Sequence, residues 1–194
     1  MNRYVKWLAL TLLSTLLVTA QSAYAAGWST ESLGGFSTVH IYTPSSNSKI
    51  GSGKALMLIL HGCTQTASAF KSAQLDAAAE EYGFIVAAPE AQYKQGFGCW
   101  AYWSGVPTRS GFGNDYVNIF NLIEALKTRE NIDSDQVYIS GFSSGGAFAM
   151  ETGCLAPDVF AGMGITAGPS AGTGAGGSMG PKEGSIPSVV AACT

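Results

Sequence analysis

Residues 136–150 read QVYISGFSSGGAFAM, a β-branched and aromatic run that meets a glycine-flanked serine and continues into helix-forming residues. This order predicts a strand, a sharp turn and a helix. Gly141 and Gly145 bracket Ser143, and glycine is favoured at both positions because a side chain there would collide with the strand and helix that meet at the turn. Such a turn holds a serine hydroxyl out above the sheet, so Ser143 is the candidate nucleophile.

Two later serines, Ser170 and Ser178, share the same glycine spacing. No strand precedes Ser178, and neither serine leads into a helix-forming segment, because the residues after each are mostly Gly, Ser, Thr and Pro. In α/β-hydrolases the pattern between a strand and a helix is the nucleophile elbow. The alternative for Ser143 is an ordinary glycine-rich turn.

Strand-like and helix-like segments alternate on both sides of this stretch. Strands are expected over residues 36–42, 55–60, 84–88 and 162–167, and helices over 67–82 and from Asn114 or Asp115 to Leu126. An unbroken apolar run such as 55–60 is typical of a strand covered on both faces. The alternation predicts an α/β fold, with a mostly parallel sheet flanked by helices and right-handed crossovers.

The strand over 55–60 leads into His61-Gly62-Cys63-Thr64-Gln65. In this fold a histidine–glycine turn after an early strand supplies one backbone N–H of the oxyanion hole, and the residue after the nucleophile supplies the other. These donors are expected to be the N–H groups of Cys63 and Ser144. We interpret His61 as structural, fixing the turn, with a catalytic role as the alternative.

The first 25 residues have the features of a secretory signal peptide: Arg3 and Lys6, an apolar run, and small residues at Ala23 and Ala25. The run is shorter than the roughly 20 residues that span a bilayer, so a retained membrane helix is the less favoured alternative. Residues 26–194 are then one secreted globular domain with no membrane segment. Cleavage would remove Arg3 and Lys6, so the remaining chain would be more negative than the −3 of the full sequence. No basic patch that could bind nucleic acid is therefore expected.

Four cysteines, Cys63, Cys99, Cys154 and Cys193, favour disulfides in a chain bound for an oxidising compartment. Three pairings are possible. We favour Cys63–Cys99 with Cys154–Cys193, because each pair brackets a compact segment of βαβ size. No metal-ligand spacing is found, so neither a metal nor an organic cofactor is expected.

Residues 89–113 form a long loop dense in aromatic side chains, among them Trp100 and Trp103. Long loops in compact domains tend to carry function. One interpretation makes the two tryptophans an apolar, substrate-binding wall of a cleft, and the other makes them a plug of the core held by a disulfide.

Five segments resemble, in matching order, the catalytic domain of extracellular poly(3-hydroxybutyrate) depolymerases, and the likeness covers roughly residues 27–194. They are LHGCTQTA at 60–67, CW at 99–100, GFSSGG at 141–146, GCLAPDVFAG at 153–162 and AGP at 167–169. The resemblance implies a secreted α/β-hydrolase serine esterase that cleaves polyester chains. It also implies both disulfides, and a linker with a polymer-binding domain further along.

The triad order of this fold is Ser, then Asp or Glu, then His, yet the two histidines, His40 and His61, both precede Ser143. The family's catalytic aspartate and histidine would fall beyond Thr194, so the 194 residues are expected to be the front part of a catalytic domain whose sheet is incomplete. Two alternatives to a polyester esterase stay open: a secreted carbohydrate esterase acting on feruloyl or acetyl groups, and a truncated, non-catalytic polymer-binding module.

Overall fold

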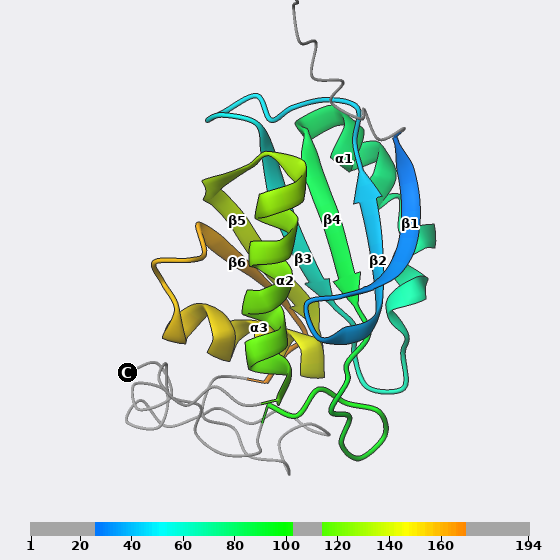
Figure 1. Cartoon of the computed structure of the whole chain (residues 1–194). Coiled ribbons are helices and arrows are strands. Elements are labelled where there is room, and N and C mark those ends of the chain that lie inside the picture. Colours follow the sequence, from blue (N-terminus) through cyan, green and yellow to red (C-terminus); the bar gives the residue numbers. More distant parts are fainter. Residues whose placement is uncertain (1–25, 103–113, 170–194) are drawn as a thin grey trace, which may run out of the picture.

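The computed structural model describes residues 26–102 and 114–169 (Figure 1). The elements in chain order are β1 (Gly27–Leu33), β2 (Phe36–Thr43), β3 (Lys54–Leu60), the 3₁₀ helix η1 (Ala67–Ser72), α1 (Leu75–Tyr82), β4 (Phe84–Pro89), α2 (Asn114–Glu130), β5 (Ile132–Phe142), α3 (Ser144–Leu155) and β6 (Gly162–Thr166).

The six strands form one sheet in the order β1-β2-β4-β3-β5-β6. β4, β3, β5 and β6 run parallel, whereas β1 and β2 form an antiparallel edge. The predicted α/β fold with a mostly parallel sheet is confirmed. β1 was not predicted, because its polar and half-exposed residues give no clear alternation.

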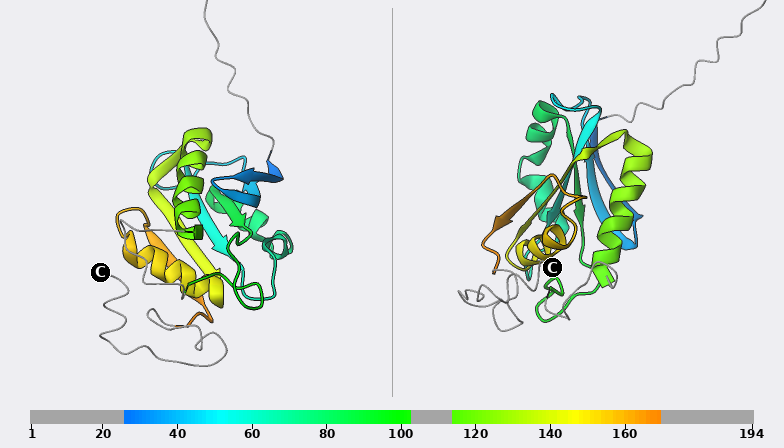
Figure 2. Two further views of the ribbon diagram at one scale, coloured as in Figure 1. Left: turned by 60° about the horizontal axis from the view of Figure 1, so that its bottom comes forward. Right: turned by 90° about the vertical axis from the view of Figure 1, so that its left-hand side faces the viewer.

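Helices cover both faces of the sheet, with α1 on one side and α2 on the other (Figure 2, right). The larger core joins the sheet to α2 and α3, and its members include Leu58, Ile119 and Phe148. A smaller core lies under α1, around Val86. The strand that leads to the elbow is therefore held on one side by two helices, which fixes its carboxyl end.

The helix predicted over residues 67–82 is divided into η1 and α1. Gln74 lies between them in the left-handed region, with φ of 56°. The Ala67 N–H at the start of η1 donates to the carboxylate of Glu90 (2.7 Å), the residue that follows β4, so this bond attaches the start of η1 to the end of that strand. Gly83 ends α1 with φ of 71°, as glycine commonly does at a helix C-terminus.

No helix within residues 26–102 and 114–169 combines the length and the apolar character that a membrane crossing requires.

Candidate active site

Ser143 lies at the sharp turn between β5 and α3. Its backbone adopts φ of 54° and ψ of −117°, a sparsely populated conformation that is strained for a residue with a Cβ atom. The Ser143 N–H donates to the carbonyl of Thr166 on β6 (2.9 Å), and its own carbonyl accepts from the Ala147 N–H of α3 (3.0 Å). The side chain is half-buried. Neighbouring elements on both sides therefore hold the strained serine in place.

Gly141 and Gly145 are required by close backbone approaches. A Cβ atom added at Gly141 would lie 2.2 Å from the carbonyl oxygen of Gly145, in the first turn of α3. One added at Gly145 would lie 2.4 Å from the carbonyl oxygens of Leu60 and His61. The first contact is the strand–helix collision expected from the sequence. The second involves the end of β3, so Gly145 allows α3 to pack on the loop that contains the expected oxyanion donor.

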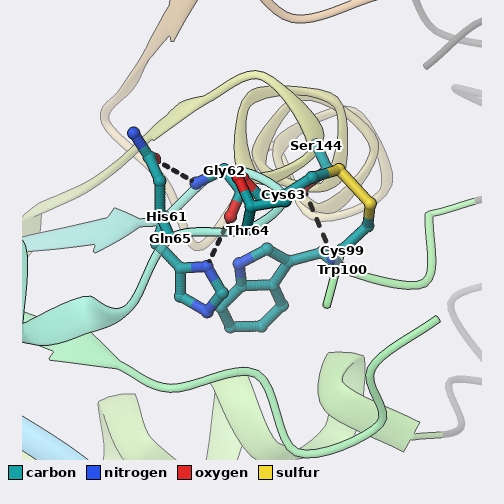
Figure 3. Close-up of a disulfide and its surroundings, with 8 residues drawn as sticks. All are labelled: His61, Gly62, Cys63, Thr64, Gln65, Cys99, Trp100 and Ser144. Carbon is teal, nitrogen blue, oxygen red and sulfur yellow. Dashed lines mark hydrogen bonds between the residues drawn. A yellow bond between two sulfur atoms is a disulfide. The ribbon is translucent and has the colours of Figure 1, made fainter. Parts of the chain in front are cut away.

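The loop 61–65 after β3, here called the oxyanion loop, is held by its own side chains (Figure 3). The Gly62 carbonyl accepts from His61 Nδ1 (2.8 Å) and from the Gln65 N–H (3.3 Å), and the Gly62 N–H donates to Gln65 Oε1 (2.8 Å). In a trans peptide the N–H points away from the C=O. Fixing the Gly62 carbonyl therefore also fixes the direction of the Cys63 N–H, for which the described residues supply no hydrogen-bond acceptor.

His61 is fully buried and uses both ring nitrogens on the backbone. Its Nε2 accepts from the Ala91 N–H (3.2 Å), so the proton is assigned to Nδ1, which donates to the Gly62 carbonyl. Burial lowers the pKa of His61 and favours the neutral ring. This arrangement agrees with the structural interpretation and leaves the ring no nitrogen with which to take a proton from a serine.

The Cys63–Cys99 disulfide predicted from the sequence is present. Beside it, the Thr64 N–H donates to the Phe97 carbonyl (2.8 Å). Residues 95–99 close a tight hairpin through two reciprocal backbone bonds between Gln95 and Cys99. The oxyanion loop and the 95–99 hairpin are thus joined covalently and by hydrogen bonding. The second predicted pair, Cys154–Cys193, includes a residue outside the described ranges.

Trp100 does not form the substrate-binding wall that was one of the two expectations. It is fully buried, and its ring centroid lies 5.0 Å from that of Phe148, 5.5 Å from that of His61 and 6.1 Å from that of Phe36. The disulfide holds the adjacent Cys99 against the oxyanion loop, and the indole fills the core beneath it (Figure 3). The core-plug interpretation is therefore correct for Trp100, while Trp103 lies outside the described residues.

Two exposed phenyl groups beside the site were not selected from the sequence. Phe97 is 69% exposed on the 95–99 hairpin, and Phe142, which immediately precedes Ser143, is 40% exposed. The alternation of β5 could have identified Phe142, because Val137 and Ile139 are buried and Phe142 belongs to the opposite face. The glycines on both sides of Phe97 were the available signal for a projecting turn.

The candidate nucleophile Ser143 lies at the turn into α3, but the described residues supply no base for it. His40 Nδ1 lies 2.8 Å from Thr30 Oγ1 on the antiparallel edge of the sheet, and burial lowers its pKa. His61 has both ring nitrogens occupied by backbone groups. Within the described ranges no side chain forms a hydrogen bond with the Ser143 hydroxyl, and no three His, Cys, Asp or Glu side chains gather as metal ligands would.

Known proteins resemble this chain in sequence and in fold. Residues 39–179 match the family model described as esterase PHB depolymerase. A poly(3-hydroxybutyrate) depolymerase of Ralstonia pickettii is 37% identical over 89% of this chain and 39% of its own length. Acetylxylan esterase A of Emericella nidulans is 35% identical over 63% of this chain and 39% of its own. This chain therefore spans about two fifths of these relatives.

Among solved structures, an acetyl xylan esterase from Aspergillus awamori superposes with a TM-score of 0.60 and 28% identity, over 70% of this chain and 48% of that one. The structural neighbours are α/β-hydrolases, so the sheet order and the strand–serine–helix elbow belong to that fold.

Proposed function

Because this chain belongs to the esterase PHB depolymerase family, we propose that it is part of a serine esterase that hydrolyses poly(3-hydroxybutyrate)-type polyester through an acyl-enzyme on Ser143. The matched relatives are carboxylic ester hydrolases. The observation that carries the proposal is the strained backbone of Ser143, at φ of 54°, because such strain is maintained only where the surrounding structure enforces it.

The proposed reaction has two halves. The Ser143 Oγ attacks an ester carbonyl carbon of the polymer while a base takes its proton, and the carbonyl oxygen becomes an oxyanion. Collapse of this intermediate expels the alcohol end of the cleaved chain, which receives the proton, and leaves an acyl group on Ser143. Water then attacks the acyl-enzyme by the same steps and releases the acid.

The Cys63 and Ser144 N–H groups are proposed to hold the oxyanion. Ser144 is the first residue of α3, where backbone N–H groups have no acceptor within the helix and the helix dipole favours negative charge. One such donor contributes about 2.7–4 kcal/mol to stabilisation of the transition state. The Cys63 donor is aimed by the oxyanion loop, in which His61 and the Gln65 N–H pin the carbonyl of the same peptide unit.

We propose that a histidine outside these 194 residues serves as the base, oriented by a carboxylate that also lies outside them. The support for this proposal is that the two histidines of these 194 residues, His40 and His61, form their described hydrogen bonds with Thr30 and with backbone groups, not with Ser143. Loss of triad members in other serine hydrolases leaves a residual acceleration of only roughly 10³–10⁴-fold over the uncatalysed reaction. The 194 residues by themselves are therefore expected to hydrolyse esters poorly.

The deciding experiment replaces Ser143 with alanine in the full-length protein and measures release of hydroxybutyrate from the polymer and labelling by a serine-directed fluorophosphonate. Ser143→Ala should abolish both. Ser170→Ala and Ser178→Ala are matched controls, because both serines share the G-x-S-x-G spacing, and both variants should keep wild-type activity. Retained hydrolysis by Ser143→Ala would refute the assignment, and granule binding by a wild-type protein that takes no label would favour a non-catalytic binding module.

A carbohydrate esterase is the second candidate, favoured by the acetylxylan esterase relatives. Turnover of hydroxybutyrate oligomers can be compared with turnover of acetylated xylan and of feruloyl esters. A higher kcat/KM for either carbohydrate substrate would replace the polyester as the proposed substrate.

We further propose that the protein is secreted after cleavage at Ala25. The support is the charged and apolar pattern of residues 1–25 together with the Cys63–Cys99 disulfide, a bond that persists in oxidising compartments. N-terminal sequencing of protein recovered from the culture medium should begin at Ala26.

A further inference from the structure

We propose that Phe97 is a polymer-contacting residue, presented by the 95–99 hairpin as an apolar anchor for the uncharged polyester surface. The inference rests on the proposed function and adds a specific contact to it. Phe97 has the largest exposed fraction among the described large apolar side chains, at 69%. A single exposed apolar residue is common on protein surfaces, so the proposal depends on how this one is held.

The hairpin projects from the body of the protein. Gly96 and Gly98 adopt φ of 52° and 77°, and these left-handed conformations make the tight turn around Phe97. A Cβ atom added at Gly96 would meet no atom within 4 Å, and one at Gly98 would only touch the Lys94 side chain at 4.0 Å. Among the described residues, the tip therefore has open space around both glycines, and the phenyl ring between them is exposed to a partner.

Three restraints hold the projecting tip rigidly. The Cys63–Cys99 disulfide and the Thr64 N–H bond to the Phe97 carbonyl attach it to the oxyanion loop. At its base, the Asp115 carboxylate accepts from the N–H groups of Gln92 and Tyr93 (3.1 and 3.0 Å). The ring is thus exposed on a fixed support, so little backbone freedom is lost when a partner covers it.

The hairpin that presents Phe97 is attached to the loop that contains the proposed oxyanion donor. Its anchor is the same loop that aims the Cys63 N–H, so the phenyl ring keeps a constant relation to the proposed oxyanion donor. Phe142 contacts this loop from the elbow: a Cβ atom at Gly62 would lie 2.9 Å from its ring. Two exposed aromatic side chains thus come from segments that touch the oxyanion loop, one of them next to Ser143.

The charge of the hairpin base suits a neutral polymer. Lys94 pairs with Glu90 (2.5 Å), so its ammonium group is neutralised beside the tip. An uncharged polyester presents methyl and methylene groups together with ester carbonyls, and a phenyl ring on a rigid support gains free energy when such groups cover it. A sugar polymer could also stack on the ring, and binding measurements on both polymers separate the two.

The test measures binding to poly(3-hydroxybutyrate) granules in a full-length Ser143→Ala background, so that binding is read without hydrolysis. Phe97→Ser should weaken granule binding about tenfold, whereas Phe97→Leu should keep most of it, because leucine still offers apolar surface. Ile50→Ser is the matched control: Ile50 is 65% exposed but lies before β3, at the opposite end of that strand from the oxyanion loop. Its granule binding should equal that of the background.

Unchanged granule binding by Phe97→Ser would overturn the inference, and so would equal losses in Phe97→Ser and Ile50→Ser, which would indicate unspecific adsorption. If Phe97→Ser loses binding to insoluble acetylated xylan but keeps its binding to granules, the inference would also be overturned, in favour of a polysaccharide as the partner of Phe97. Hydrolysis of soluble hydroxybutyrate oligomers by the wild-type protein tests the proposed function separately. If that hydrolysis is found and Phe97→Ser binds granules normally, only the role of Phe97 fails.

Discussion

At the scale of single residues, the His61 ring determines the direction of a peptide bond that it does not itself contain. Its Nδ1 donates to the Gly62 carbonyl, and the N–H of the same peptide unit belongs to Cys63. Burial lowers the pKa of this histidine, and both ring nitrogens have backbone partners, so any effect of the ring on catalysis would act through the proposed Cys63 donor.

We predict that His61→Leu lowers kcat on the order of 10²-fold with little change in KM, because the Cys63 donor loses its alignment. His61→Asn should retain more of kcat, since the asparagine Nδ2 stands near the position of Nδ1 and can still donate to Gly62. Steady-state kinetics on a soluble ester provide the measurement, with near-ultraviolet circular dichroism to verify the fold. Equal losses of kcat in both variants would contradict the positioning role.

Glu151 is another buried titratable residue, and its described hydrogen-bond partner is Tyr116. Its carboxyl group, on α3, is hydrogen-bonded by the hydroxyl of Tyr116 on α2, and the Tyr116 ring stacks on Phe148 with centroids 4.0 Å apart. Burial raises the pKa of Glu151 to about 7, against the smaller lowering by Tyr116. The folded protein thus favours the protonated acid. Its contribution to stability is complete below about pH 4.5 and is lost as the pH rises through about 7.

We predict that Glu151→Gln removes this dependence. Between pH 5 and pH 8, the free energy of unfolding of the wild-type protein should fall relative to that of the variant by on the order of 3 kcal/mol. Urea unfolding of both proteins at the two pH values gives the difference. Parallel curves for the two proteins would show that Glu151 has an ordinary pKa.

At the scale of elements, the proposed site depends on the connection between the oxyanion loop and the 95–99 hairpin. The disulfide joins residues 36 apart in sequence, and in the loop-entropy model such a bond restricts the unfolded chain by roughly 3–4 kcal/mol. It also limits movement of the residue whose N–H is the proposed donor. A loss of this bond should therefore affect both stability and turnover.

We predict that Cys63→Ser combined with Cys99→Ser lowers the free energy of unfolding by roughly 3 kcal/mol and also reduces kcat on soluble esters. Urea unfolding and steady-state kinetics, both at a temperature where the variant remains folded, separate the two effects. If stability falls while kcat stays at the wild-type value, the disulfide has only a structural role.

At the scale of the whole molecule, distant parts of the chain are joined around the sheet. Arg129 near the end of α2 pairs with Glu31 on β1 (2.9 Å), and its guanidinium also contacts Glu130 (2.7 Å). Cys154 lies at the end of α3, and its proposed partner Cys193 would connect this helix to the last residues of the chain. Such a bond would stabilise the half of the sheet that contains the elbow.

We predict that peptide mapping without reductant yields two cross-linked pairs, Cys63 with Cys99 and Cys154 with Cys193. Mass spectrometry of a tryptic and chymotryptic digest identifies them, with a reduced digest as the control. A peptide joining Cys154 to any other cysteine, or a Cys154 that is alkylated before reduction, would contradict the second pair.

The parallel core of the fold, the turn at Ser143 and the Cys63–Cys99 disulfide could all be predicted from the sequence. These features depend on local rules: apolar runs of strand length, a serine between glycines where strand meets helix, and cysteines that bracket a compact segment. Gly141 shows the reason most clearly, because its excluded Cβ would meet an atom only four residues away. Where a constraint acts between near neighbours, the sequence contains the information.

The orientation of the aromatic side chains, by contrast, depends on long-range packing. Trp100 and Phe97 are three residues apart in one loop, yet one is fully buried and the other is 69% exposed. The glycines on both sides of Phe97 indicate a turn, but no local pattern predicts that Trp100 is buried, because the contacts that bury it come from Phe36, His61 and Phe148 in three distant segments. For His61 the sequence indicated a structural role in the turn, but its second partner, the Ala91 N–H, comes from a distant segment and is brought to the ring only by the fold. Burial and hydrogen-bond partners are properties of packing, and packing joins residues that the sequence separates.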